Sequence, residues 1–217
     1  VATFAPINYT ITYKNMQNAT LPESQENPAT YTVEDDAITL VNPTRAGYIF
    51  KGWTGTDLTE ATMTVTIPAN SIGDREFTAN WQVITYAITY DLAGGSVNPA
   101  NKDKYTVETA TFTLTNPTKT GYTFTGWTGT DLSDKTMTVT ITKGSYGERT
   151  YTATRIVNTY KVNYDSNGGD NGDMAEQDFV YDVAQALIAN AYSRTGYTFK
   201  NWNLQQDGQG TAYADKQ

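Results

Sequence analysis

Polar residues that recur at matching positions are the first candidates for chemistry in this chain. Tyr31–Trp81 aligns with Tyr105–Arg155 at a shift of 74 residues, and more than half of the aligned positions are identical. Such self-similarity marks a duplicated unit. The acidic residues that both copies share are, in corresponding pairs, Glu34 and Glu108, and Asp57 and Asp131; Ser71 and Ser145 also correspond. Paired carboxylates could act as acid and base on a glycosidic bond, and a serine could act as a nucleophile.

The residues that would activate such groups are missing. The chain has no histidine and no cysteine, which excludes a Ser-His-Asp triad and a thiolate ligand. No lysine is shared by the two copies, so a repeated Ser-Lys pair is excluded as well. Asp57 and Asp131 close the segment W-T-G-T-D, which is typical of a turn whose carboxylate accepts nearby backbone N–H groups. Units this small rarely enclose a substrate, so we expect no enzyme activity, no catalytic residue and no cofactor.

One segment, Asp165–Asp173, is acidic and rich in glycine, as calcium loops are. Gly169 stands where the third ligand of an EF-hand loop should be, and the sixth position is not glycine. Asn171 replaces a glycine that the G-G-x-G-x-D pattern of calcium-binding repeats requires. We therefore expect a solvated hairpin loop and no metal site, with calcium binding as the alternative.

Trp53, Trp127 and Trp202 recur in three copies of one segment, which reads GYIFKGWTGTDL, GYTFTGWTGTDL and, more loosely, GYTFKNWNLQQD. Each tryptophan is either a core residue that every small unit needs or a platform on which a sugar ring stacks. Large aromatic side chains are mostly buried, so we expect core residues. The glycines that open the three segments are expected to lie in turns; they are Gly47, Gly121 and Gly196.

Short strands must position these residues, because threonine and tyrosine are abundant and both suit pleated surfaces. Alternating apolar and polar residues predict a strand at 84–91 that ends in a glycine turn at 93–95. The other strands expected in this copy lie within 105–116, at 122–127 with a bulge at the glycine before Trp127, at 137–142 with Met137, Val139 and Ile141 on one face, and at 150–154. In the third copy, VAQALIANAY at 183–192 has the composition of a short helix.

The repeats divide the chain into three units, at 7–82, 83–157 and 158–217. The chain passes from the last strand of one unit into the first strand of the next without a linker rich in proline or serine, which limits bending. Only 15 residues follow Trp202, whereas Trp81 lies 28 residues after Trp53. We therefore expect the third unit to lack its closing strand, and its open edge could then pair with another chain.

The charge and hydropathy of the chain exclude two classes of partner. A net charge of −8 and a sequence pI of about 4.5 disfavour binding to a phosphate backbone, so no nucleic acid partner is expected. No run of about 18 apolar residues is present, so we expect no membrane insertion of these residues. We expect a monomer apart from edge pairing at the third unit.

Residues 158–217 resemble the Listeria–Bacteroides repeat family, which includes the B repeats of Listeria internalins. The resemblance rests on YKVNYDSNGG, DFVYD, ALIANAYSRTGYTFKNWN and DGQGTAYAD, in this order. The first two units resemble longer members that keep G-Y-x-F-x-G-W and carry TMTVTI in place of the last motif. The second unit departs further, because Arg155 stands where the first unit has its final tryptophan, Trp81.

The resemblance implies a mostly β (β-rich α+β) fold of tandem, β-grasp-like modules. It also implies an extracellular bacterial surface protein attached to the cell wall, in which the repeats act as a stalk or spacer and in adhesion. The partners would then be proteins or glycans of a host or bacterial surface. The alternative is a carbohydrate-binding or accessory module of a secreted protein that acts on polysaccharides.

Overall fold

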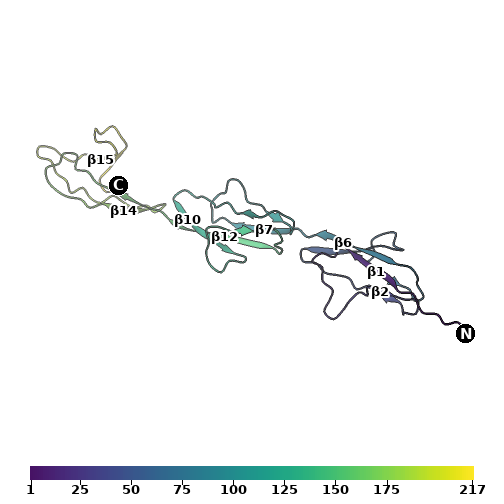
Figure 1. The fold of residues 1–217 in the computed structure, drawn as a ribbon. Coiled ribbons are helices and arrows are strands. Elements are labelled where there is room, and N and C mark those ends of the chain that lie inside the picture. The colour runs from purple at the N-terminus through teal and green to yellow at the C-terminus, as the bar shows by residue number, and fades with distance from the viewer. The chain divides into compact units, whose positions relative to one another are not determined.

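The computed structural model describes residues 1–217 and consists of sixteen strands with no helix (Figure 1). The expected mostly β fold is therefore confirmed, whereas the β-grasp-like arrangement stays a prediction. The chain separates into two compact units. The first comprises residues 1–89, 101–114 and 139–151, and the second comprises 90–100, 115–138 and 152–217. The middle sequence repeat contributes to both units, and the three domain boundaries given above stay a prediction.

The first repeat is built on a four-stranded sheet in the order β2-β1-β6-β4. Its strands are β1 (Tyr9–Lys14), β2 (Thr30–Tyr31), β4 (Tyr48–Gly55) and β6 (Arg75–Val83). β1 is parallel to β6 and antiparallel to β2, whereas β4 is antiparallel to β6. β1 forms because Y-T-I-T-Y-K alternates, which turns Ile11 into the core and the threonines to solvent.

The middle repeat has the same arrangement, because its sheet runs β10-β12-β7-β8. These strands are β7 (Tyr86–Asp91), β8 (Lys104–Tyr105), β10 (Tyr122–Gly129) and β12 (Arg149–Val157). Each of the first two repeats adds a two-stranded sheet. These small sheets pair β3 (Ile38–Thr39) with β5 (Thr66–Ile67), and β9 (Phe112–Thr113) with β11 (Thr140–Ile141).

The segment at 137–142 forms less strand than its alternating pattern predicts. Only β11 is extended and paired there. Val139 and Ile141 are buried as expected, but Met137 is half exposed at 51%. The expectation that Met137 shares the core face was wrong, because the chain bends at Met137, between the Thr136 bridge and β11, and the alternation of the strand does not continue through the bend.

The bulge predicted at Gly126 stays a prediction, but the equivalent glycine of the first repeat, Gly52, lies at a bulge. The register of β4 against β6 shifts between Phe50 and Gly52. Gly52 has φ of +107°, and a Cβ there would lie 2.8 Å from the backbone of Thr62. The glycine is therefore required by both the local conformation and the close approach of a neighbouring segment.

The third repeat contains only two small sheets. β13 (Thr159–Val162) pairs with β14 (Gln177–Val180), and β15 (Trp202–Asn203) pairs with β16 (Ala212–Tyr213). No strand runs beside β13 as β6 runs beside β1, so one edge of β13 is unpaired.

The helix expected at 183–192 does not form. Its backbone groups bond to residues outside the segment instead of to each other. The Gln177 side-chain amide donates to the Ala186 carbonyl at 2.8 Å, and its oxygen accepts from the Ile188 N–H at 3.0 Å. Helix-forming composition is a weak preference, and tertiary hydrogen bonds override it here.

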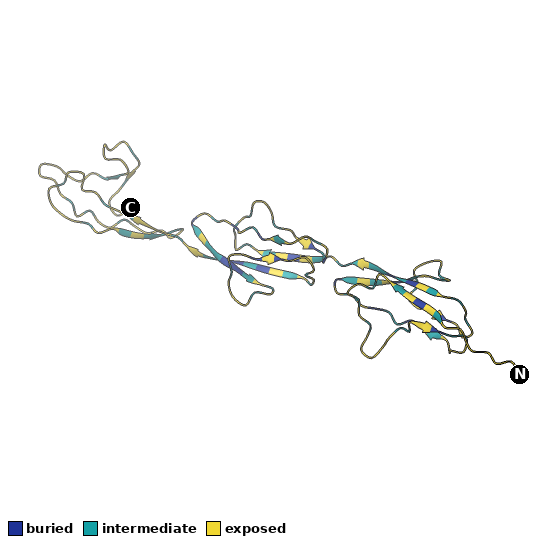
Figure 2. Ribbon diagram, viewed as in Figure 1, coloured by how far each residue is buried: buried dark blue, intermediate teal, exposed yellow.

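Buried residues concentrate in the first two repeats (Figure 2). The core of the first repeat consists of Ile11, Tyr31, Leu40, Trp53, Val65, Ile67, Phe77 and Ala79. In contrast, no residue from Asn158 onward is fully buried. The third repeat therefore gains less from removing apolar surface from water than the other two.

Candidate functional site

Trp53 and Trp127 are core residues. Both are 0% exposed, and each packs against a phenylalanine of its own strand, with ring centroids 5.4 Å and 5.5 Å apart. Each indole N–H donates to an asparagine side chain, Trp53 to Asn42 at 3.1 Å and Trp127 to Asn116 at 2.9 Å. The core interpretation is confirmed for these two residues, and neither ring can serve as a sugar platform.

Trp202 keeps the ring cluster but loses the hydrogen bond. Its ring lies 4.8 Å from that of Tyr164 and 5.1 Å from that of Phe199. Ala191 stands at the position of the asparagine, five residues before the Gly-Tyr pair, and the buried Nε1 of Trp202 has no partner. The side chain itself is half-buried. The third repeat thus has the same cluster of aromatic rings, but its tryptophan is less buried and lacks a hydrogen-bond acceptor.

Among the shared acidic residues, Asp57 and Glu108 each bind a side chain of the protein, and Asp57 and Asp131 lie in turns. Asp57 and Asp131 adopt φ of 61° and 59°, which confirms that both lie in turns. The carboxylate of Asp57 pairs with the Arg75 guanidinium, so the expected acceptance of local backbone N–H groups was wrong for Asp57. A charged donor outcompetes a neutral amide for a carboxylate. Glu108 accepts a hydrogen bond from the Tyr48 hydroxyl at 2.9 Å.

The paired serines also belong to turns. The Ser71 hydroxyl donates to the Pro68 carbonyl at 2.6 Å, and the Ser145 hydroxyl lies 3.3 Å from that of Thr142. Each hydroxyl therefore contacts the residue three positions earlier in its own loop. This is the local bonding by which serine stabilises turns.

Two carboxylates of the acidic loop at 165–173 accept hydrogen bonds from backbone N–H groups, one within the loop and one outside it. Asp165 accepts from the Asn167 N–H at 2.7 Å, and Asp170 accepts from the Thr195 N–H at 2.9 Å. The hydrogen bond from Thr195 lowers the pKa of Asp170 below its usual value. The structure contains no cluster of three or more acidic side chains that could hold a metal ion. Whether the loop binds calcium in solution stays a prediction.

The glycines that open the first two repeated segments contact the following repeat. Gly47, Gly121 and Gly196 have φ between 76° and 80°, so the turn interpretation is confirmed. In addition, a Cβ at Gly47 would lie 2.1 Å from the Val107 side chain, and a Cβ at Gly121 would lie 2.1 Å from the Tyr181 ring. The glycine is thus required by the neighbouring repeat as well as by the turn.

Gly47 and Gly121 are each accompanied by two further contacts with the following repeat. The Gly47 carbonyl accepts from the Ile84 N–H at 2.9 Å, and the Gly121 carbonyl accepts from the Asn158 N–H at 2.8 Å. The residue after the glycine reaches the same neighbour: Tyr48 donates to Glu108, and the Tyr122 ring lies 5.9 Å from that of Tyr181 in an edge-on contact. Burial and the Glu108 hydrogen bond raise the pKa of Tyr48.

Sequence reasoning missed these contacts, although a signal was present. The Gly-Tyr pair recurs in all three copies, and a basic residue stands two positions before its glycine each time. Val107 and Tyr181, which meet the glycines, are different residue types in different repeats. No pattern of identity therefore links the two sides of the contact.

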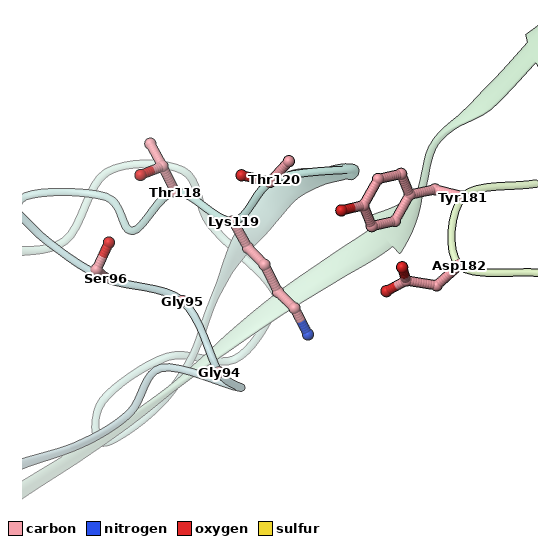
Figure 3. A pocket seen from close by; sticks show the side chains of 8 residues that line it. All are labelled: Gly94, Gly95, Ser96, Thr118, Lys119, Thr120, Tyr181 and Asp182. Carbon is pink, nitrogen blue, oxygen red and sulfur yellow. The ribbon is translucent and has the colours of Figure 1, made fainter.

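An open hollow of about 420 Å³ lies beside the second of these contacts (Figure 3). Its lining is Gly94, Gly95, Ser96, Thr118, Lys119, Thr120, Tyr181 and Asp182. Figure 3 shows the Lys119 side chain extending across the space between Gly94 and Asp182. The Lys119 amine also lies 4.3 Å from the centre of the Tyr122 ring. The hollow has polar walls and a wide opening. It lies where Tyr181 and Asp182 of the third repeat meet the second repeat.

The model of the Listeria-Bacteroides repeat domain matches residues 9–79, 86–153 and 160–217. The chain belongs to this family. The three matched segments correspond to the three sequence repeats, so the family resemblance is confirmed for the third repeat and for the two longer repeats before it. Nearly the whole of the chain is therefore built from tandem Listeria-Bacteroides repeats.

Two similar proteins come from Evansella cellulosilytica. One, named "Putative membrane protein", is 30% identical over 180 residues, which cover 80% of this chain and 26% of the relative. The other, named "Putative Gly-rich membrane protein", is 29% identical over 170 residues, which cover 75% of this chain and 18% of the relative. The chain thus spans about a quarter or less of each relative's length. No solved structure matches it, and no helix in the chain is long and apolar enough to cross a membrane.

Proposed function

We propose that these repeats form a non-catalytic stalk or spacer in a bacterial extracellular, cell-wall-attached surface protein, with a contribution to adhesion. Membership of the Listeria-Bacteroides repeat family supports a surface location. The names of the two Evansella relatives support an association of the parent protein with the cell envelope. Its partners would be proteins or glycans at a host or bacterial surface.

The shortness of the connections between repeats carries this proposal. Two residues separate the end of β6 at Val83 from the start of β7 at Tyr86. A single residue, Asn158, separates β12 from β13. In both connections a backbone N–H donates to the Gly-Tyr glycine of the preceding repeat. Connections that are short and hydrogen-bonded restrict the swing of one repeat against the next, as a spacer requires.

The roles of the shared polar residues support a non-catalytic function. Asp57 pairs with Arg75, Glu108 binds Tyr48, and Ser71 bonds within its own turn. A general base or nucleophile must instead lie within reach of a bound substrate. The alternative role in carbohydrate binding is disfavoured, because two of the three repeated tryptophans, Trp53 and Trp127, are buried and cannot stack on a sugar ring.

Location and spacing can be tested separately in the producing bacterium. Antibodies raised against this chain should label intact cells, and labelling only after permeabilisation would contradict the surface location. Deleting residues 83–157 from the parent protein should lower the access of a bulky antibody to an outer tag while a small dye still reaches it. Equal antibody access after the deletion would contradict the spacer role.

A further inference from the structure

The contact between successive repeats has two complementary sides, which can be defined by residue. The acceptor triplet consists of a basic residue, the turn glycine and the following tyrosine. The insert pair consists of an apolar or aromatic residue and the acidic residue after it. The acceptor triplets are Arg45-Gly47-Tyr48, Lys119-Gly121-Tyr122 and Arg194-Gly196-Tyr197; the insert pairs are Val33-Glu34, Val107-Glu108 and Tyr181-Asp182.

The insert pairs are equivalent by strand register as well as by sequence. Tyr31, Tyr105 and Phe179 are each paired with the tyrosine at the same point of the first strand of their repeat. Val33, Val107 and Tyr181 each follow two residues later. Each repeat therefore presents an apolar side chain and a carboxylate from the same turn.

Two of the three acceptor triplets are filled. Val107 lies against Gly47 and is 8% exposed, and Glu108 takes the hydroxyl hydrogen bond of Tyr48. Tyr181 lies against Gly121 and meets the ring of Tyr122. In both cases the insert pair comes from the following repeat, so the contact runs from one end of a repeat to the other end of the next.

The third triplet has the same geometry and is open. The Arg194 guanidinium lies 4.4 Å from the centre of the Tyr197 ring, compared with 4.0 Å for Arg45 over Tyr48 and 4.3 Å for the Lys119 amine over Tyr122. Gly196 has φ of +80°, nothing lies within 4 Å of a Cβ built on it, and Tyr197 is 68% exposed.

An insert pair is also open elsewhere in the chain. Val33 is half-buried and Glu34 is exposed, whereas their counterpart Val107 is buried against a glycine. The chain therefore presents one unfilled side of each kind. The open insert pair carries a negative charge and the open acceptor triplet carries a positive charge, so their charges are complementary.

We propose that Arg194, Gly196 and Tyr197 form a docking site for a further Listeria-Bacteroides repeat, which inserts the apolar residue of its insert pair against Gly196 and directs its carboxylate to Arg194 and Tyr197. This site continues the two contacts already made, because in each of them the glycine and the tyrosine meet the insert pair while the basic residue lies over the tyrosine ring. The site recognises another repeat whether or not the array serves as a stalk.

The test joins two copies of the full chain through a flexible Gly/Ser linker, which raises the effective concentration of the second copy's first repeat near the open triplet. Gly196 should then give two amide NMR resonances of equal intensity, one from the docked site and one from the open site of the second copy. Gly121, which is filled in both copies, should give one. A single unshifted Gly196 resonance, identical to that of the single chain, would overturn the proposal.

Matched variants separate docking from an unrelated change in the third repeat. Val33→Asp in the second copy should merge the two Gly196 resonances, because it places a charge at the apolar contact. Changing Gly196 itself to alanine in the first copy should release the insert pair, as reported by the Val33 amide. Gly208→Ala is the control, because Gly208 has φ of +76° and open space around it, and should leave docking intact. Loss of docking in the control, or none on Val33→Asp, would also overturn the proposal.

Discussion

The indole N–H is the residue-scale feature that best distinguishes a complete core from an incomplete one. Asn42 and Asn116 accept from Trp53 and Trp127, whereas Trp202 has no acceptor because Ala191 takes that position. A buried donor without a partner costs about 1–3 kcal/mol. The third repeat therefore carries a local defect that a single side chain could remove.

Exchanging these residues should change stability in opposite directions. Asn116→Ala should lower the free energy of unfolding by about 1–3 kcal/mol, because it leaves the Trp127 N–H buried and unpaired. Ala191→Asn should slow amide exchange in the third repeat by supplying the missing acceptor. Both effects are measurable by denaturation and hydrogen exchange. An unaltered unfolding midpoint for Asn116→Ala would show that the Trp127 hydrogen bond contributes nothing.

Tyr13 should make the first repeat sensitive to alkaline pH. Burial raises the pKa of Tyr13 to about 12, so the unfolded chain loses this proton first as the pH rises above about 10. The stabilisation is therefore complete below pH 10 and decreases as the pH rises toward 12. Tyr13→Phe keeps the ring contacts and removes the titrating group. The difference in unfolding free energy between wild type and Tyr13→Phe should fall across this range, and a constant difference would contradict the assignment.

The substitution of arginine for the closing tryptophan illustrates what sequence could not settle. Trp81 donates to the Asn15 carbonyl at 2.9 Å, and Arg155 donates to the carbonyl of Leu92, which is the corresponding residue of the next repeat. Two chemically different side chains thus hold the same loop. The replacement of tryptophan by arginine is visible in the sequence. That both side chains do the same thing depends on a backbone carbonyl, and residue identity does not reveal that acceptor.

At the scale of elements, the sequence predicted the strands of the first two repeats better than the third repeat. Alternation fixed the long strands, because burying one face of a sheet requires period two. The predicted helix at 183–192 failed because the Gln177 side chain and other distant groups take its backbone hydrogen bonds. Such nonlocal partners cannot be read from a ten-residue composition.

The third repeat should be the least protected part of the chain. It has no fully buried residue, and β13 has one unpaired edge. Amides of β13 and β14 should therefore exchange faster than those of β7 and β12, because few buried contacts oppose local opening. Native-state hydrogen exchange measures this directly. Equal protection in the two pairs of strands would contradict the expectation that the unpaired edge of β13 and the sparse core lower its protection.

At the scale of the whole molecule, the recurrence of the Gly-Tyr segment reflects two requirements. The tryptophan serves the core of its own repeat, and the Gly-Tyr pair receives the next repeat. The first role could be predicted from one repeat alone. The second role could not be predicted, because Val107 and Tyr181 lie about 60 residues after the glycines that they contact. The two residues are also of different types and have only a non-polar side-chain surface in common.

The glycine contact should restrain each repeat against the next, and spin-label distances between the first two repeats measure this restraint. The chain has no cysteine, so Glu60→Cys and Asp134→Cys place labels at corresponding exposed positions. Gly47→Ala should broaden the distance distribution, because its methyl group would overlap Val107. Gly73→Ala is the matched control, since Gly73 has φ of +91° and open space around it. We expect a narrow distribution for the parent and for Gly73→Ala and a broad one for Gly47→Ala; equal widths in all three would show that the glycine contact does not restrain the repeats.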